Sequence, residues 1–345
     1  MMRDFNVLLT CCSMHVKERI DSLKENEDGV NVGVYAVNSV EANLPPDGMT
    51  DGQYVVPPIF DKDYISTVLD ICKRHSIDVI VPTATIELGL MARNKGFFER
   101  EGVKVSVSSP ESIDVANDKI ELHKRYGSLM PRQVIPNTLE DVQEFHESLP
   151  KGSRICCKLS NHAGGNGFAI VDRKKALDIT LFNKFGENRY IAFKDLAEIL
   201  ERRTENVIIQ EYADGHDYTV SLLAVNGEVT HIVGYIGYQM SFGAIVSGEI
   251  MFNERAYDIA TQITKELRLD GNACFDFRIK ENGEVVLLEV NPRVNASLPF
   301  VWKAGINMLY LRCKNLLGDY SNINENHRIQ FGLKMRKYYD TTYFV

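Results

Sequence analysis

The chain has 345 residues, of which 44% are hydrophobic and 25% are charged, an ordinary composition for a soluble globular protein of two or three domains. Its formal net charge is −8 and its basic residues form no large cluster, which argues against a nucleic acid or a membrane surface as partner. No apolar run has the length of a signal-peptide core or of a bilayer span, so we expect a cytoplasmic protein without a membrane segment.

Seven cysteines are present, an odd number, and none of them forms a C-x-x-C motif. The adjacent pairs Cys11-Cys12 and Cys156-Cys157 lie inside apolar, strand-like runs, so we interpret the cysteines as reduced and mostly buried thiols. A catalytic cysteine is the competing interpretation, but no cysteine stands in a nucleophile-like context.

The first 110 residues alternate strand and helix signals. Apolar runs and helical spacing predict strands at 5–10, 30–37, 78–82 and 103–108, and helices at 16–24, 63–75 and 86–96. Such alternation predicts a parallel sheet with helices on both of its faces.

The segments that follow two of these strands bear on ligand binding. The first strand leads into residues 10–13 (TCCS) instead of G-x-G-x-x-G, which disfavours a Rossmann dehydrogenase, the rival at the level of the fold. Residues 83–87 follow the strand at 78–82, at the edge where open α/β sheets bind ligands. A plain helix N-terminus capped by Thr85 is the other interpretation of the same residues.

After Pro110 the pattern changes to a longer succession of elements. Helices are predicted at 119–126, 139–148, 174–184, 194–203, 254–268 and 306–317, and strands at 154–158, 168–171, 207–211, 218–225, 228–235, 272–279 and 285–290. Residues 226–227 and 282–283 are both Asn-Gly, the dipeptide that two-residue hairpin turns prefer, so a tight turn is predicted at each.

The hairpin around residues 282–283 carries the strongest signal in the sequence. With these two residues as the turn, Asp276 falls directly opposite Glu289, and Cys274 falls opposite Asn291. The register is well specified, because a slip of one residue would bury the charges. The other face is wholly apolar and must be buried; it carries Phe275, Phe277, Ile279, Val286, Leu288 and Val290.

The polar face of this hairpin is suited to a metal ion. Directly opposed side chains have Cβ atoms roughly 5 Å apart, and like charges at that distance destabilise a sheet. A divalent cation between Asp276 and Glu289 removes the repulsion, and such oxygen ligands suit Mg²⁺, which also binds substrate phosphates. The alternative is a solvated face with an accidental pair of acids, although Asn291 and Arg293 further along the same face argue against chance.

A glycine-rich loop follows an apolar strand that ends in Lys158. Gly164, Gly165 and Gly167 precede the next strand at 168–171, so the order is strand–loop–strand and not the strand–loop–helix of a P-loop. Glycines so closely spaced allow backbone N–H groups to approach phosphate oxygens, and the Lys158 ammonium can reach the same phosphates. Taken alone, the glycines are explained equally well by a mobile hairpin.

The strand at 207–211 runs into a short linker and then to Asp217. Main-chain groups at such a linker commonly bind a purine, and a carboxylate commonly holds a ribose diol. By itself, however, this segment is an ordinary strand end followed by acids.

The order of these motifs resembles that of the ATP-grasp superfamily. The likeness is strongest to single-unit proteins similar to the carbamoyl-phosphate synthetase large subunit and to the pyrrolysine-biosynthesis ligase, and it extends over nearly the whole chain. The motifs that carry it are Lys119 after Asn-Asp, Lys158 before the glycine loop, Gln210-Glu211-Tyr212 before Gly215-His216-Asp217, and Asp276 before Glu289-x-Asn291-x-Arg293.

The resemblance implies an α/β protein that is α+β in its ATP-grasp part. A Rossmann-like pre-ATP-grasp domain at 1–112 would precede a two-lobed ATP-grasp domain at 113–345. That domain would comprise a lid subdomain at about 151–213 and a metal-binding C-terminal lobe at about 214–345.

The resemblance also implies a role for each matching residue. Lys119 and Lys158 would contact the nucleotide phosphates, and the loop at 164–167 would close over them. Asp217 would hold the ribose, and Arg293 would stabilise an acyl phosphate and a tetrahedral intermediate, which makes Lys158 and Arg293 the catalytic candidates. The adenine would be held by Gln210, Glu211, Tyr212 and Ala213, and one or two Mg²⁺ or Mn²⁺ ions by Asp276, Glu289 and Asn291.

These roles imply an ADP-forming ligase that couples a small-molecule carboxylate to an amine, with amino acids among the candidate substrates; a homodimer is compatible with this. Formation of carbamoyl phosphate from bicarbonate is a second hypothesis, disfavoured because that reaction uses two ATP-grasp units. A non-catalytic ATP-binding module is a third, disfavoured because the acidic hairpin and Arg293 are both intact. Substrate-selecting side chains are expected on irregular segments at 236–250 and 294–303, and a disordered lid is the alternative for the first.

Overall fold

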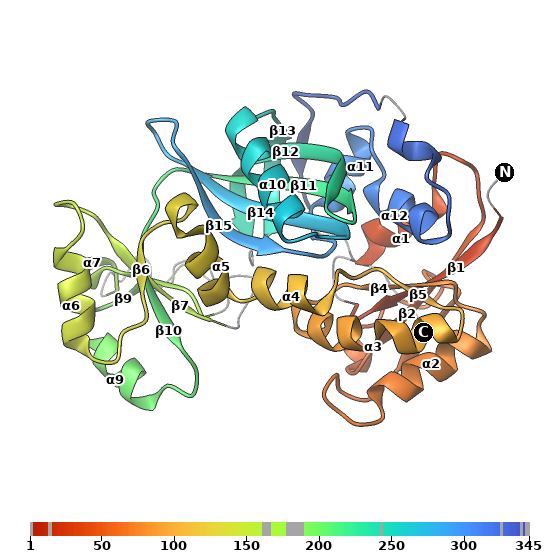
Figure 1. Ribbon diagram of the computed structural model, residues 1–345, viewed down its shortest axis with the longest axis horizontal. Helices are drawn as coiled ribbons and strands as arrows, with labels where there is room; N and C mark the ends of the chain where they lie inside the picture. The colour runs from red at the N-terminus through yellow and green to blue at the C-terminus, as the bar shows by residue number, and fades with distance from the viewer. Residues whose placement is uncertain are drawn as a thin grey trace.

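The computed structural model describes residues 3–12, 16–160, 167–176, 190–241, 244–324, 327–338 and 341. Within these residues the chain forms three β-sheets, which follow one another along the long axis of the molecule (Figure 1). The α/β fold class predicted from the sequence, with a parallel sheet at the N-terminus, is confirmed.

The N-terminal sheet is parallel. In spatial order, its strands are β3 (Gly52–Val55), β2 (Val32–Asn38), β1 (Phe5–Thr10), β4 (Val79–Pro82) and β5 (Lys104–Val105). Both of its faces are buried, since Val7 and Leu8 of β1 belong to different core clusters. Helix α1 (Val16–Lys24) covers the first face, and α2 (Tyr64–Arg74) and α3 (Leu88–Arg100) cover the second, as the alternation of signals predicted.

The second sheet forms a lobe at the opposite end of the molecule from the N-terminal sheet (Figure 1). Its spatial order is β6 (Gln133–Val134), β10 (Val207–Glu211), β7 (Ile155–Leu159), β8 (Ala169–Val171) and β9 (Tyr190–Ile191). Helices α6 (Leu139–Glu147) and α9 (Asp195–Arg202) pack on it and complete a core cluster of its own. Helix α7 (Arg173–Ala176) begins the helix predicted at 174–184, the rest of which lies outside the described residues.

The third sheet is antiparallel and carries the acidic hairpin. Its spatial order is β15 (Val285–Asn291), β14 (Gly271–Ile279), β11 (His216–Val225), β12 (Glu228–Ser241), β13 (Ala244–Ile250) and β16 (Lys334–Arg336). One face packs on α10 (Glu254–Glu266), and the other on α11 (Leu298–Lys303) and α12 (Met308–Leu316). Helices α11 and α12 also contact α1, so one continuous core joins the third sheet to the N-terminal sheet (Figure 1).

Two capped helices, α4 (Pro110–Ala116) and α5 (Lys119–Tyr126), connect the N-terminal sheet to the second one. The side chains of Ser109 and Asp118 accept backbone N–H groups in their first turns, which fixes where each helix begins. Lys119 is therefore held at the first position of α5. Short 3₁₀ helices η1 to η4 lie at Glu41–Asn43, Thr85–Glu87, Gly127–Leu129 and Ser321–Asn324.

The two Asn-Gly turns differ. At residues 226–227 the turn has two residues, both with positive φ (51° and 91°), as predicted. At residues 282–283 the predicted two-residue turn is wrong. The N–H of Lys280 donates to the carbonyl of Glu284 at 2.9 Å, so the loop has three residues, and its last, Gly283, has a φ of 83°.

A β-bulge compensates for the extra loop residue. The register shifts between Asp276 and Phe277, which leaves Leu288 without an opposite residue. Leu287, and not Leu288 as predicted, therefore lies opposite Phe277 in the core. Beyond the bulge the predicted register is restored, and Asp276 pairs with Glu289.

The two segments expected to be irregular are largely regular. Residues 236–250 belong to strands β12 and β13, apart from 242–243, which lie outside the described residues. The second half of 294–303 is helix α11. Pairing with β11 and packing on the core override the glycine-rich composition of the first segment.

The cysteines are free thiols, and all except the half-buried Cys11 are buried, as predicted. Burial raises the pKa of Cys12, Cys72 and Cys313 to about 12, so none of these three is a thiolate at neutral pH. No helix of the described ranges is both long and apolar enough to cross a membrane.

Gly215→Ala, in the linker between β10 and β11, is expected to destabilise the fold. Gly215 has a φ of 128°, and a Cβ there would lie 2.1 Å from the carbonyl oxygen of Ile279. The strain and the clash together should lower the free energy of unfolding by roughly 3 kcal/mol. In the control Gly283→Ala (φ 83°, no atom within 4 Å of the added Cβ) backbone strain acts alone and should cost about 1 kcal/mol. Urea denaturation measures both, and equal losses would contradict the clash.

Candidate active site

Hydrogen bonds organise the polar face of the β14–β15 hairpin. The Asn291 amide donates to both acids, with Nδ2 3.2 Å from Asp276 Oδ2 and 3.0 Å from Glu289 Oε1. Thr219 lies opposite Asp276 on β11 and donates from Oγ1 to Asp276 Oδ1 at 2.7 Å. The structure thus brings the three predicted metal ligands together, and it adds Thr219, which single-strand alternation could not identify.

The two carboxyl groups differ in their tendency to ionise. Burial, and then the negative charge of Glu289, raise the pKa of Asp276 well above its usual range. Burial also opposes the ionisation of Glu289, but the Lys119 ammonium and the Asn291 amide outweigh it, and the pKa of Glu289 is lowered. A cation placed between the two acids would remove the penalty that keeps Asp276 from ionising.

The donor set fits a hard divalent cation. No group of three or more His, Cys, Asp or Glu side chains that could hold a metal occurs among the described residues, so the acids form no metal cage of their own. Mg²⁺ requires no such cage, because it binds through one or two carboxylates together with waters and substrate phosphates. The amide nitrogen of Asn291 now faces the acids, and half a turn of the amide would present Oδ1 in its place.

The two lysines predicted to bind phosphates lie near this pair of acids. Lys119 Nζ is 3.9 Å from Glu289 Oε2, and burial lowers the pKa of Lys119 although Glu289 opposes this. Lys158 on β7 donates to Gln210 Oε1 on β10 at 2.6 Å, and its charge also helps to lower the pKa of Glu289. One ammonium group from outside the third sheet therefore contacts its acidic hairpin, and a second acts on it through its charge.

The linker predicted to bind adenine is a packed segment. The N–H groups of Glu211 and Tyr212 donate to the carbonyl oxygens of Arg132 and Arg154, each at 2.8 Å. The Arg154 guanidinium lies over the Tyr212 ring, 4.5 Å from its centroid, and Ala213 is buried. The backbone of the linker is thus held from two sides.

Asp217, the predicted ribose ligand, is engaged by an arginine that the sequence analysis missed. Arg278 Nη1 and Nη2 each lie 3.1 Å from an oxygen of the Asp217 carboxylate, and Nη1 also donates to the Gly215 carbonyl at 3.1 Å. Burial nevertheless raises the pKa of Asp217. Arg278 lies opposite Asp217 across the β11–β14 pair. The contact could have been predicted only if the pairing of these two strands had been known.

Arg293 links the hairpin to the N-terminal sheet. Its Nε donates to Thr85 Oγ1 at 2.8 Å, Nη1 to the Val294 carbonyl at 3.0 Å, and Nη2 to Asn291 Oδ1 at 3.4 Å. These partners are neutral oxygen atoms, so the charge of the guanidinium remains available to an anionic ligand.

Of the two interpretations of residues 83–87, the one with Thr85 as a helix cap is wrong. Ala84 is the N-cap residue of η2, and Thr85 is the first residue of that 3₁₀ helix. The buried Glu87 carboxylate accepts the N–H groups of Thr83 at 2.8 Å and Ala84 at 3.0 Å, which fixes the turn that presents Thr85 to Arg293. This edge of the N-terminal sheet therefore belongs to the candidate site.

Of the three loop glycines, Gly164 and Gly165 lie outside the described residues. Gly167 has a φ of 69°, and its carbonyl accepts the N–H of Leu159 at 3.1 Å. A Cβ at Gly167 would lie 2.7 Å from the Leu159 side chain, so both the conformation and the close approach favour glycine.

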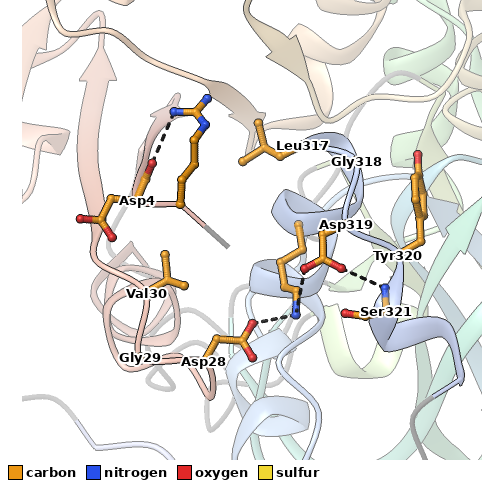
Figure 2. A pocket seen from close by; sticks show the side chains of 11 residues that line it. Asp4, Asp28, Gly29, Val30, Leu317, Gly318, Asp319, Tyr320 and Ser321 are labelled. Atoms are coloured by element: carbon orange, nitrogen blue, oxygen red, sulfur yellow. Dashed lines mark hydrogen bonds and ion pairs between the residues drawn. The ribbon is translucent and has the colours of Figure 1, made fainter. Parts of the chain in front are cut away.

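A cavity of about 980 Å³ lies elsewhere, beside the start of β1 (Figure 2). Three of its charged groups are already paired with one another, since Lys314 Nζ lies 2.7 Å from Asp28 Oδ2 and 3.6 Å from Asp319 Oδ2. Thr85 and Arg293 lie at the opposite, carboxyl end of the N-terminal sheet. The cavity is therefore separate from the candidate site.

A parallel α/β sheet, an antiparallel sheet with an acidic hairpin and a small lobe that supplies Lys158 define an ATP-grasp architecture. The family described as "ATP-grasp in the biosynthetic pathway with Ter operon" matches residues 203–340, and the one described as "PylC-like, N-terminal domain" matches residues 7–106. The matches identify an ATP-grasp domain over residues 203–340 and a PylC-like N-terminal domain over residues 7–106.

Curated relatives are much longer than this chain. The carbamoyl phosphate synthase large chain of Buchnera aphidicola subsp. Acyrthosiphon pisum is 24% identical over 281 residues, which cover 74% of this chain and 25% of the relative. The protein of the same name from Archaeoglobus fulgidus is 26% identical over 236 residues, covering 64% of this chain and 20% of the relative. This chain therefore spans a quarter or less of the length of these proteins.

Solved structures share the fold at low sequence identity. The ADP complex of PurK, an N5-carboxyaminoimidazole ribonucleotide synthetase, has a TM-score of 0.68 at 11% identity, covering 97% of this chain and 81% of its own. The L-amino acid ligase from Bacillus licheniformis has a TM-score of 0.61 at 18% identity, covering 92% of this chain and 75% of its own. The biotin carboxylase domain of Hydrogenobacter thermophilus 2-oxoglutarate carboxylase, in complex with MgADP and bicarbonate, has a TM-score of 0.66 at 16% identity, with coverages of 92% and 71%.

Asp276→Asn is expected to remove a pH dependence of stability from the metal-free protein. Because the folded-state pKa of Asp276 is raised, its contribution to stability is complete below the unfolded-state pKa and is lost as the pH rises through the folded-state pKa. The melting temperature of the wild type, measured in EDTA, should therefore fall relative to that of the variant from about pH 4 to neutrality. Mg²⁺ with ATP should narrow this gap, and a gap that does not vary with pH would contradict the assignment.

Proposed function

We propose that the protein is an ATP-dependent carboxylate–amine ligase that forms an acyl phosphate and releases ADP and phosphate. The observation that carries the proposal is the position of the Asp276–Glu289 pair, with the Lys119 ammonium on one side and Asn291 and Arg293 on the other. Phosphoryl transfer needs cationic groups around the phosphates, and the carboxylate that attacks needs a cation of its own. The named synthetase and ligase among the structural neighbours support this assignment.

In this proposal the chain comprises a pre-ATP-grasp domain at 1–112 and an ATP-grasp domain at 113–345. The ATP-grasp domain contains a lid lobe at about 151–213 and a C-terminal lobe at about 214–345, and the nucleotide lies between these two lobes. Lys119, Lys158 and Gly167 contact the phosphates. The adenine and the ribose are held by Gln210, Glu211, Tyr212, Ala213 and Asp217.

The acidic face would hold one or two Mg²⁺ ions through Asp276, Glu289 and Asn291. A metal ion bound there would act as a Lewis acid and neutralise negative charge on phosphate oxygens. The chain's own residues prepare this position, because Thr219 orients Asp276, and Lys119 keeps Glu289 ionised. Arg278 holds Asp217, and a ribose diol would share that carboxylate with it.

The chemistry follows from the poor electrophilicity of a carboxylate. An amine cannot displace an oxide ion from a carboxylate, so the carboxylate must first be given a better leaving group. An oxygen of the substrate carboxylate attacks the γ-phosphorus, the bond to the β-phosphate oxygen breaks, and ADP leaves. The amine then attacks the acyl carbon, and phosphate leaves as the amine loses its proton. Arg293 places a positive charge where negative charge develops on the tetrahedral intermediate. The substrates are a small carboxylate and an amine, with amino acids as candidates, and the free thiols support a cytoplasmic setting.

The curated relatives favour a second candidate, the phosphorylation of bicarbonate or carbamate. The two candidates share the nucleotide site and differ in the acceptor. ADP release that depends on bicarbonate and needs no organic acid would identify the second one.

Lys158→Ala is expected to weaken Mg-ATP binding by about tenfold or more, since it removes the ammonium group that would contact the phosphates in this proposal. Isothermal titration with a non-hydrolysable ATP analogue measures the effect without knowledge of the other substrates. Lys151→Ala, at an exposed position of the same lobe, is the matched control and should bind like the wild type. Equal affinity of all three proteins would overturn the proposed nucleotide site.

Isotope transfer tests the chemistry itself. In a screen of carboxylate and amine pairs, the productive pair should release ADP, and oxygen-18 from the carboxylate should be found in the released phosphate by mass spectrometry. The reason is that attack at the γ-phosphorus forms the acyl phosphate, whose bridging oxygen comes from the substrate. Label in AMP would show attack at the α-phosphorus and would contradict the acyl-phosphate mechanism.

A further inference from the structure

Arg19, on α1, is a buried arginine with two side-chain nitrogens that find no hydrogen-bond acceptor among the described residues. The residue is 4% exposed, and within the described part of the chain its Nε and Nη1 atoms are enclosed without a partner. The acid beside it, Glu18, is engaged by Lys337 at 2.9 Å. A buried guanidinium is costly when it is left unpaired, so a residue of this kind calls for a reason other than stability.

Other buried cations of this protein show the contrast. Arg312 is 2% exposed, and its Nη1 and Nη2 atoms lie 3.1 and 2.7 Å from the two carboxylate oxygens of Asp270. Lys314, which lines the cavity beside the start of β1, is held by Asp28 and Asp319. These two residues have the acidic partners that Arg19 lacks, which is why the Arg19 position and not the cavity indicates a ligand.

Arg19 lies next to the candidate active site. Helix α1 begins beyond the carboxyl end of β1, at the edge where open α/β sheets bind ligands. Arg19 lies beside Leu298 and Trp302 of α11, the helix that follows Arg293 in the chain, around a gap too small to hold a water molecule. Burial, and then the positive charge of Arg293, lower the pKa of Arg19 to about 10, so the Arg19 guanidinium is still cationic at neutral pH. Two neighbouring cationic side chains are suited to an anionic ligand.

We propose that Arg19 binds a carboxylate of the substrates that is not phosphorylated, while Arg293 acts on the reacting one. This inference rests on the proposed ligase function, and it narrows the substrate class. At least one substrate then carries a carboxylate that survives the reaction, as an α-amino acid joined through its amino group or a dicarboxylic acid does. Because Lys119 and Lys158 would bind the phosphates of ATP, Arg19 is not needed there and is assigned to the acceptor side.

The first test separates a ligand-binding arginine from a structural one. Arg19→Met keeps most of the apolar stem and removes the unpaired charge, so the melting temperature should stay unchanged or rise by a few degrees. The matched variant Arg312→Met leaves Asp270 buried without its partner and should lower the melting temperature. An Arg19→Met protein destabilised as much as Arg312→Met would show a structural role and overturn the proposal.

The second test uses acetate, succinate and L-glutamate as probes in thermal-shift measurements with Mg-ADP, against sodium chloride of equal ionic strength. Succinate and L-glutamate should stabilise the wild type more than acetate does, Arg19→Met should lose this difference, and Arg19→Lys should recover part of it. A full response in Arg19→Met, or no response to any carboxylate in the wild type, would overturn the proposal. The wild type and Arg19→Met should both show a rise in melting temperature with Mg-ATP. If the wild type shows no such rise, the result counts against the ligase function and not against the role of Arg19.

Discussion

Two carboxylates that one hairpin forces together are the constraint on which the proposed site depends. The apolar face of β14 and β15 must be buried, so Asp276 and Glu289 become neighbours on the other face. The surrounding groups offset the repulsion between the two carboxylates: Asn291 and Thr219 donate hydrogen bonds to them, and Lys119 lowers the pKa of Glu289. The site is therefore built to take up positive charge, and a nucleotide with its metal would provide the missing counterpart.

Each sheet contributes a different kind of group to this arrangement. The third sheet provides the acids, the second provides Lys158, and the N-terminal sheet provides Thr85, which holds Arg293. In the proposed function these roles are separated in space, because phosphate contacts would come from the lid side and acceptor contacts from the N-terminal side. The strand ends of the N-terminal sheet, which carry no dinucleotide motif, would then serve the acceptor.

Features with local geometry were predictable from the sequence, and features that depend on distant pairing were not. The Asp276–Glu289 opposition follows from alternation along two adjacent strands, and it survived a wrong turn length only because a bulge restores the register. The contact between Thr85 and Arg293 joins positions 208 residues apart, and no local pattern announces it. Arg19 was missed for another reason, since a charged residue on a short helix is normally solvent-exposed.

The distribution of the apolar core has a consequence for how this architecture can be recombined. The lid lobe has a core cluster of its own, whereas the N-terminal and third sheets share one through α1, α11 and α12. A chimera that exchanges the lid with that of a distant relative would cut few buried contacts. An exchange of the N-terminal domain would instead have to match a complementary surface across the shared core. If that domain serves the acceptor as proposed, acceptor specificity and the central scaffold are constrained to change together.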